Sequence, residues 1–213
     1  MTDKTRAPQD RPLRRILVWD LPVRLSHWLM VACFAGAWIT AEEDQWRRVH
    51  AVLGYSLALL AGFRIYWGII GTRHAQFGSF VRGPRETVRY VRQMLRGHPP
   101  HYTGHNPAGA VAILALLAMT LLVTCFGWLA YTTHIEWLGE THELLANVMI
   151  ALVGVHVAGA LAGSWLHREN LVGAMITGRK LGYPDEAAER PMLPIGLIVL
   201  VCLLAFWWLE WTT

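Results

Sequence analysis

The chain has 213 residues, of which 54% are hydrophobic and 16% are charged, and its mean hydropathy is +0.32. This composition is too apolar for an ordinary soluble domain of that length, so we expect an integral membrane protein. The net charge of +4 comes from basic residues between the apolar stretches, where they report membrane orientation, and it implies no nucleic-acid partner.

Five apolar stretches approach the roughly 20 residues that are needed to span a bilayer. In chain order they are 21–40, 49–71, 107–131, 142–165 and 194–211. They predict an all-α membrane protein, with a four-helix transmembrane bundle and a fifth, C-terminal transmembrane helix. The remaining residues are loops or termini, so 1–213 form a single membrane domain. Residues 1–15 show no apolar core and cleavage site, which predicts no removable signal peptide.

Lysine and arginine collect on one side of the predicted spans. They lie before the first span, after the second and after the fourth, at Lys4, Arg6, Arg11, Arg14, Arg15, Arg73, Arg82, Arg85, Arg89, Arg92, Arg96, Arg168, Arg179 and Lys180. The connections after the first and third spans hold the acidic residues Glu42, Glu43, Asp44, Glu136, Glu140 and Glu143. The positive-inside rule therefore predicts a cytoplasmic N-terminus and an outer C-terminus.

The long connection between the second and third spans contains an amphipathic pattern over residues 84–96. Pro84 opens it, and arginine recurs on one face while Val88, Val91 and Leu95 repeat on another. This pattern predicts a surface helix that contacts membrane lipid at the inner leaflet. A docking surface for an acidic protein is the alternative.

Four histidines lie in the predicted spans and pair by depth. His142 and His156 are fourteen residues apart, almost four helical turns, so both leave the same face of one helix at a separation of about 21 Å along its axis. His27 lies near the inner end of the first span, and His50 near the outer end of the second. The topology therefore pairs His27 with His156 at the inner side and His50 with His142 at the outer side.

Two such pairs are what two stacked bis-histidine haems require. A neutral imidazole on each face of a porphyrin gives a six-coordinate iron that suits electron transfer. Cys33, Cys125 and Cys202 are isolated and no Cys-x-x-Cys-His run occurs, which predicts two non-covalent haems of b type. The four histidines are then the iron ligands.

A single histidine near a membrane surface is more often an amphipathic side chain than a ligand, but four that coincide by depth favour ligation. Histidines in loops or at span ends are expected to be solvated: His74, His98, His101, His105, His134 and His167. His167 is the main competitor, because it lies three turns beyond His156 near the same face.

Arg64 follows His50 by fourteen residues, which places it at the depth of His156. A charge there needs a partner, and we expect a propionate of the inner haem, with Arg24 as a second candidate for this role. The alternative is that both arginines extend to the cytoplasmic surface. Gly54, Gly62 and Gly154 leave room for a flat macrocycle, although they equally suit close helix packing.

The runs VWDLPVRLSHW, WRRVHAVLGY, GHNPAG, HELLANVMIALVGVHV and HRENLVGAMITGRK resemble the bacterial di-haem b-type cytochromes that include the membrane subunit of nickel-iron hydrogenases. The resemblance covers residues 18–180. It implies two haems held by the first, second and fourth helices, which maps the ligands onto His27, His50, His142 and His156. A related formate dehydrogenase subunit binds quinone beside its cytoplasmic-side haem, which implies a quinone site near His156, Asn106 and Gly109. Alternatively, Asn106 caps the third helix.

These features predict transmembrane electron transfer in the bacterial inner membrane. The outer haem would exchange electrons with a periplasmic redox protein, such as a hydrogenase, a cytochrome c or a dehydrogenase, and the inner haem with quinone. A stand-alone superoxide:quinone oxidoreductase is the alternative. The fifth span carries an aromatic belt of Phe206, Trp207, Trp208 and Trp211 at its outer end. Whether it docks a partner subunit or a second copy of the chain stays open.

Overall fold

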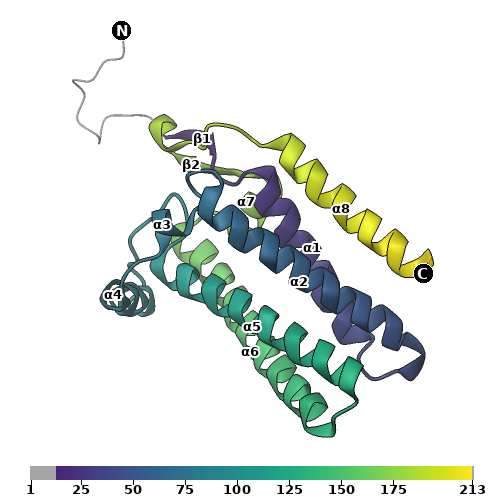
Figure 1. Cartoon of the computed structure of the whole chain (residues 1–213). Helices are drawn as coiled ribbons and strands as arrows, with labels where there is room; N and C mark the ends of the chain where they lie inside the picture. The colour runs from purple at the N-terminus through teal and green to yellow at the C-terminus, as the bar shows by residue number, and fades with distance from the viewer. Residues whose placement is uncertain (1–12, 213) are drawn as a thin grey trace.

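The structure is a computed structural model that describes residues 13–212. The expectation of no signal peptide and the basic residues Lys4, Arg6 and Arg11 lie outside the described residues. Five long helices cover the five predicted stretches and pack along one another (Figure 1): α1 (Leu21–Ile39), α2 (Arg47–Ile70), α5 (Pro107–Thr133), α6 (Glu136–His167) and α8 (Leu193–Thr212).

The short elements connect these helices, and most of them gather at the end of the bundle where α1 begins (Figure 1). They are β1 (Arg14–Leu17), η2 (Asp44–Trp46), α3 (Phe77–Phe80), α4 (Pro84–Leu95), α7 (Leu171–Thr177), β2 (Arg179–Gly182) and η3 (Pro184–Glu186). The shared end is called the inner end below. The opposite end, which holds η2, the α5–α6 connection and the C-terminus, is called the outer end.

Four helices of the described chain are long and apolar enough to cross a membrane: Asp44–Ile70, Pro107–Thr133, Glu136–His167 and Leu193–Thr212. The 19-residue α1 is not among them, although the sequence predicts five spans. Polar residues in its first two turns, Arg24, Ser26 and His27, lower its hydropathy.

The start of α1 is fixed by the buried Asp20. Its Oδ1 caps the helix by accepting a hydrogen bond of 2.9 Å from the Val23 N–H. Its Oδ2 accepts bonds from the Trp67 indole N–H at 2.9 Å and from the Thr72 hydroxyl at 2.7 Å. One carboxylate therefore ties the first turn of α1 to the end of α2.

The connection between α5 and α6 is shorter than the sequence suggests. It consists of His134, in the left-handed conformation with φ 58°, and Ile135. The expectation that Glu136, Glu140 and Glu143 lie in a loop is therefore wrong, because α6 begins at Glu136. A carboxylate in the first turn of a helix is favourable beside the N–H groups exposed there.

A two-stranded antiparallel sheet at the inner end was not predicted. Register pairs run from Arg14 with Gly182 to Leu17 with Arg179, so the segment before α1 pairs with the segment that the sequence treats as a linker. Val18 and Trp19 donate their N–H groups to the Gly178 carbonyl and bury their side chains. Val18 and Trp19 form an apolar cluster with Ile16 of β1 and Ala174 of α7, which stabilises the position of the sheet.

The α4 helix matches the predicted amphipathic segment to within one residue. Figure 1 shows it nearly end-on where the long helices are seen lengthwise, so it lies across the inner end and packs against α5. Tyr90 anchors it and is 2% exposed, whereas Val88 and Leu95 are 50% and 79% exposed.

The C-terminal helix α8 docks on its own chain. Val199 and Leu203 join Cys33, Leu57 and Leu60 in the apolar core between α8, α1 and α2. Trp207 turns inward and donates its indole N–H to the hydroxyl of the fully buried Ser56 at 2.8 Å. Of the four residues of the predicted aromatic belt, Trp208 and Trp211 are 71% and 54% exposed, whereas Phe206 and Trp207 pack against the core.

We predict that Ser56→Ala lowers the free energy of unfolding by about 2 kcal/mol, because the Trp207 N–H is left without an acceptor. The measurement is thermal denaturation followed by circular dichroism in detergent. Ser79→Ala is the control, since its hydroxyl is exposed, and it should leave the transition unchanged. An equal loss in both variants would contradict the docking role of Ser56.

Candidate haem-binding site

The structure brings the outer histidines together. The rings of His50, in the first turn of α2, and His142, in the second turn of α6, have centroids 5.9 Å apart and planes at 88°. Metal–imidazole bonds are about 2 Å long, so a separation of this order suits two imidazoles that face one iron. The pairing by depth of His50 and His142 is confirmed, and their ligation of iron stays a prediction.

Both outer rings are oriented by backbone carbonyls on neighbouring helices. His50 Nδ1 lies 2.9 Å from the Ala37 carbonyl of α1, and His142 Nδ1 lies 2.9 Å from the Val123 carbonyl of α5. A carbonyl only accepts, so Nδ1 carries the proton and Nε2 keeps its lone pair free for a metal. A hydrogen bond from Nδ1 to a carbonyl in this way orients the ring and prepares Nε2 as a metal ligand.

Gly127 of α5 makes room for the His142 ring. A Cβ atom at this position would lie 2.9 Å from both Cε1 and Nδ1 of His142, closer than van der Waals contact allows. The sequence did not indicate this role of Gly127. Its only signal is a glycine within an otherwise apolar helix, which does not reveal which side chain approaches it.

The inner histidines lie on α1 and α6, whereas the outer histidines lie on α2 and α6. His27 of α1 and His156 of α6 are close enough to interact electrostatically, and His27 Nδ1 is buried without a hydrogen-bond partner among the described residues. His167 instead lies beside residues 96–106, the loop between α4 and α5 that is called the inner-end loop below. Its ring centroid lies 5.5 Å from that of His101 in this loop. His156 is therefore the better inner ligand on α6.

The α6 helix, which carries one histidine of each pair, does not pack tightly on α1 or α2, which carry the other two. α1 packs against α2, and α6 packs along α5 and α7, while no comparable packing joins α6 to α1 or α2 in the described chain. A Cβ at Gly54, one turn after His50, would meet no atom within 4 Å. A Cβ at Gly62 or Gly154 would likewise meet no atom within 4 Å, so all three glycines border open space beside their helices in the described chain.

Arg64 is buried, at 5% exposed, so the alternative that it extends to the surface is wrong. Its guanidinium lies 5.1 Å from the centre of the Phe77 ring, and neither terminal nitrogen has a hydrogen-bond partner among the described residues. Arg24 is half-buried and donates from one terminal nitrogen to the Ile176 carbonyl. A buried cation with free N–H groups fits the carboxylate of a haem propionate.

Of the histidines expected to be solvated, His74 is buried and His105 is half-buried with its Nδ1 atom buried. His74 is 9% exposed and its Nε2 lies 2.6 Å from the Glu186 carbonyl oxygen. The His105 ring lies against Trp19 and Phe80, with centroids 4.3 and 4.5 Å away. Burial, and then the positive charges nearby, hold the pKa of His105 well below its ordinary value. Trp19, which follows β1, together with Phe80 of α3 and Glu186 of η3 covers these two rings.

Asn106 caps α5. Its Oδ1 accepts a hydrogen bond of 2.7 Å from the Gly109 N–H, and Pro107 occupies the first turn. The capping alternative from the sequence is therefore confirmed. A role for Asn106 and Gly109 in quinone binding stays a prediction that depends on the resemblance.

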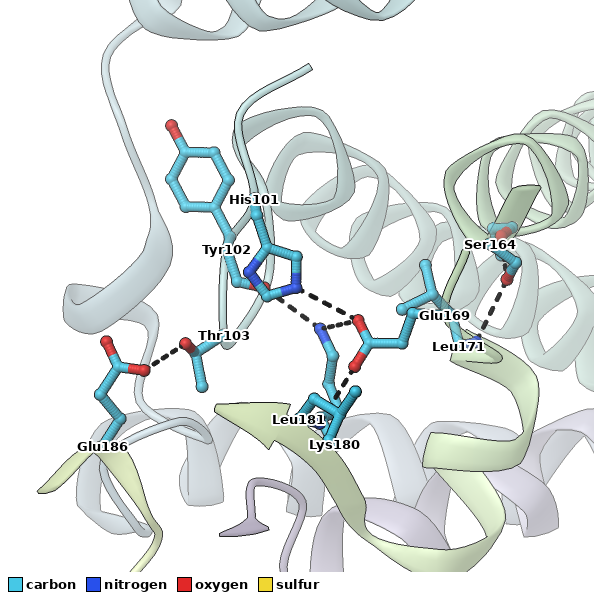
Figure 2. A network of polar contacts seen from close by, with 10 residues as sticks. His101, Tyr102, Thr103, Ser164, Glu169, Leu171, Lys180, Leu181 and Glu186 are labelled. Atoms are coloured by element: carbon cyan, nitrogen blue, oxygen red, sulfur yellow. Dashed lines mark hydrogen bonds and ion pairs between the residues drawn. The ribbon is translucent and has the colours of Figure 1, made fainter. Parts of the chain in front are cut away.

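A buried ion pair clamps the inner-end loop (Figure 2). The ammonium of Lys180 lies 3.2 Å from Glu169 and donates to the Tyr102 carbonyl at 3.1 Å. The other Glu169 oxygen accepts from the Leu181 N–H, and His101 approaches the first at 3.4 Å. Burial lowers the pKa of Lys180, and Glu169 partly opposes this shift. The clamp holds the loop that leads into His105.

We predict that Gly127→Ala displaces the His142 ring and lowers the content of the outer haem. The measurement is a pyridine haemochrome assay per mole of purified chain. Gly139→Ala is the matched control, because a Cβ there would meet no atom within 4 Å and alanine is the better helix former. Full haem content in the Gly127→Ala protein would contradict this role.

We predict that Lys180→Met lowers the free energy of unfolding by about 3 kcal/mol, because it leaves the Glu169 carboxylate buried without its cation. The double variant Lys180→Met with Glu169→Gln should recover part of that loss in a thermal denaturation experiment. A double variant that is less stable than Lys180→Met alone would show that Glu169 acts mainly through its bonds to His101 and Leu181.

The described residues contain no group of three or more histidine, cysteine, aspartate or glutamate side chains that could hold a bare metal ion. Instead, the rings of His50 and His142 lie close together, and His27 and His156 interact electrostatically, so each pair would supply two imidazoles to one haem iron. The donor set, the free Nε2 atoms and the buried arginine fit a haem.

Comparisons with known proteins agree with this chemistry. The model of the family described as prokaryotic cytochrome b561 matches residues 18–178. A probable Ni/Fe-hydrogenase B-type cytochrome subunit of Rhodobacter capsulatus is 23% identical, over 88% of this chain and 90% of the relative. The corresponding subunit of Azotobacter vinelandii is 25% identical, over 80% and 90%. A probable Ni/Fe-hydrogenase 1 B-type cytochrome subunit of Escherichia coli K12 is 24% identical, over 56% and 62%.

No solved structure matches the chain. The family match covers the four histidines, both arginines and the GHNPAG segment, and it ends before α8. The chain therefore belongs to the prokaryotic cytochrome b561 family, as a helical, multi-pass bacterial membrane protein that carries haem b and transfers electrons within the membrane.

Proposed function

We propose that the chain binds two haems b, one above the other, and conducts electrons between a periplasmic redox protein and quinone. The observation that carries this proposal is the outer pair, in which His50 and His142 face each other with both Nδ1 atoms engaged by carbonyls. The inner pair lies about 21 Å further along α6 and would join His27 to His156, with His27 Nδ1 left without a hydrogen-bond partner among the described residues.

The histidines would hold the irons, and the rest of the chain would fix the histidines. A bound haem supplies a one-electron couple whose two oxidation states keep the same ligands. Carbonyl bonds to His50 and His142 hold those rings in one orientation, so little reorganisation accompanies electron transfer. At the inner end, Arg64 would neutralise a propionate that is otherwise buried without a cation.

The proposal takes α1 as a fifth span, with the inner end in the cytoplasm. Its packing between α2 and α8 supports this, because His27 then lies at the depth of His156. The basic residues near the inner end favour the same orientation. The exposed arginines of α4 beside Val88 and Leu95 suit contact with anionic lipid at the inner leaflet.

A hydrogenase is the redox partner that the comparisons support best, because the relatives are named as hydrogenase cytochrome subunits. Exposed carboxylates at the outer end, Glu136, Glu140 and Glu143, offer a surface for a periplasmic protein. A cytochrome c or another dehydrogenase would meet the same surface. Quinone would exchange electrons at the inner haem near His156 and Asn106.

We expect His142→Ala and His156→Ala each to retain one haem of the two, because each removes a ligand from a different pair. His167→Ala is the matched control on the same helix and should retain both. The measurement is a pyridine haemochrome count per chain, together with a reduced-minus-oxidised spectrum. A wild-type protein with one haem, or loss of a haem in His167→Ala, would overturn the ligand assignment.

A further inference from the structure

The buried nitrogen atoms that lack a partner concentrate at the inner end. Seven buried side-chain polar atoms in the described chain have no hydrogen-bond partner, and five of them belong to Arg24, His27, Arg64 and His105. All five are nitrogens of basic side chains. Buried polar atoms are normally paired, so this group has the chemistry of a site for an oxygen acceptor.

The acidic side chains nearby do not supply that acceptor. Asp20 is the carboxylate that acts electrostatically on Arg64, but its oxygens accept bonds from Val23, Trp67 and Thr72. Glu169 is engaged by Lys180 and the Leu181 N–H. The free N–H groups of Arg64 and His105 are therefore available to a ligand and not committed to the fold.

Both side chains are held in place by apolar contacts. His105 lies against Trp19 and Phe80, in a loop that the Lys180–Glu169 clamp secures. Arg64 lies over Phe77, which approaches α2 closely because residue 68 is glycine: a Cβ there would lie 2.1 Å from the Phe77 ring. Phe77 also packs against Phe80, with ring centroids 5.8 Å apart, so Arg64 and His105 contact one aromatic cluster, and Arg64 and His156 both act electrostatically on His105.

We propose that His105 and Arg64 together bind a partly or fully negative oxygen atom of a ligand next to His156. This inference rests on the proposed function. It gives a binding role to His105, which the sequence predicted to be a solvated loop residue. Two groups carry such an oxygen there, the carboxylate of the inner haem propionate and the carbonyl of a quinone. Arg64 supplies charge, and the neutral His105 supplies one N–H donor.

The test compares His105→Phe with the wild-type holoprotein. Phenylalanine keeps a ring between Trp19 and Phe80 and removes both nitrogens, so haem content should stay at the wild-type value. Two properties are then measured: the midpoint potential of each haem by optical redox titration, and the KM for haem reduction by decylubiquinol. His98→Phe is the matched control, because His98 is exposed in the same connection.

A shift in the midpoint potential of one haem, with an unchanged KM, assigns the oxygen to the propionate. A KM raised by about tenfold, the effect of one lost hydrogen bond, with unchanged potentials, assigns it to the quinone. His105→Gln, which keeps an N–H donor, should recover most of either effect. His105→Leu provides the same comparison if the phenylalanine variant does not fold.

The inference is overturned if His105→Phe and His105→Leu match His98→Phe in both measurements while they keep the wild-type haem content. That result would leave the proposed function intact, because the haem count of the wild-type protein does not depend on His105. A wild-type protein with a single haem would overturn the proposed function instead.

Discussion

A polar atom inside an apolar helix bundle is costly unless a partner meets it, and this constraint shapes most of the structure. Asp20 is the clearest case, since its two oxygens accept three hydrogen bonds and join the start of α1 to the end of α2. Ser56 does the same for α8 through Trp207. In both places a polar side chain that looks unfavourable in an apolar segment fixes how two helices meet.

The two histidine pairs differ in how the protein satisfies their polar nitrogen atoms. At the outer end, carbonyls of α1 and α5 satisfy the Nδ1 atoms of His50 and His142, so each ring has one committed nitrogen and one for a metal. At the inner end, nitrogens of His27, Arg64 and His105 stay without a partner among the described residues. The outer end is thus organised by the protein itself, whereas the inner end has a surplus of donors suited to ligand oxygens.

Helix packing does not bring α6 directly against α1 or α2. The helices α1, α2 and α8 share one apolar core, α2 also packs against α5, and α6 packs along α5 and α7. The histidines of α1 and α2 therefore approach those of α6 through their side chains and not through close backbone contact. Such an arrangement leaves width for a flat ring system between helices, as cofactor sites in helix bundles require.

The sequence by itself determined the membrane character, the five long helices to within a few residues at most ends, and the pairing of His50 with His142. Hydropathy and the 3.6-residue period are local properties, so they can be read without the fold. The six-residue error at the start of α6 has a local cause too, since Glu136 and Glu140 are polar yet favourable in the first turns of a helix.

Only the tertiary structure decided the surroundings of the inner pair. The sequence predicts that His105 and His74 are solvated loop histidines, but Trp19, Phe80 and Glu186 cover them through contacts with distant parts of the chain. The roles of Gly127 and of the Lys180–Glu169 ion pair likewise depend on contacts with residues that are distant in the sequence. A periodic pattern states which face of one helix a residue occupies, but it does not state which other element meets that face.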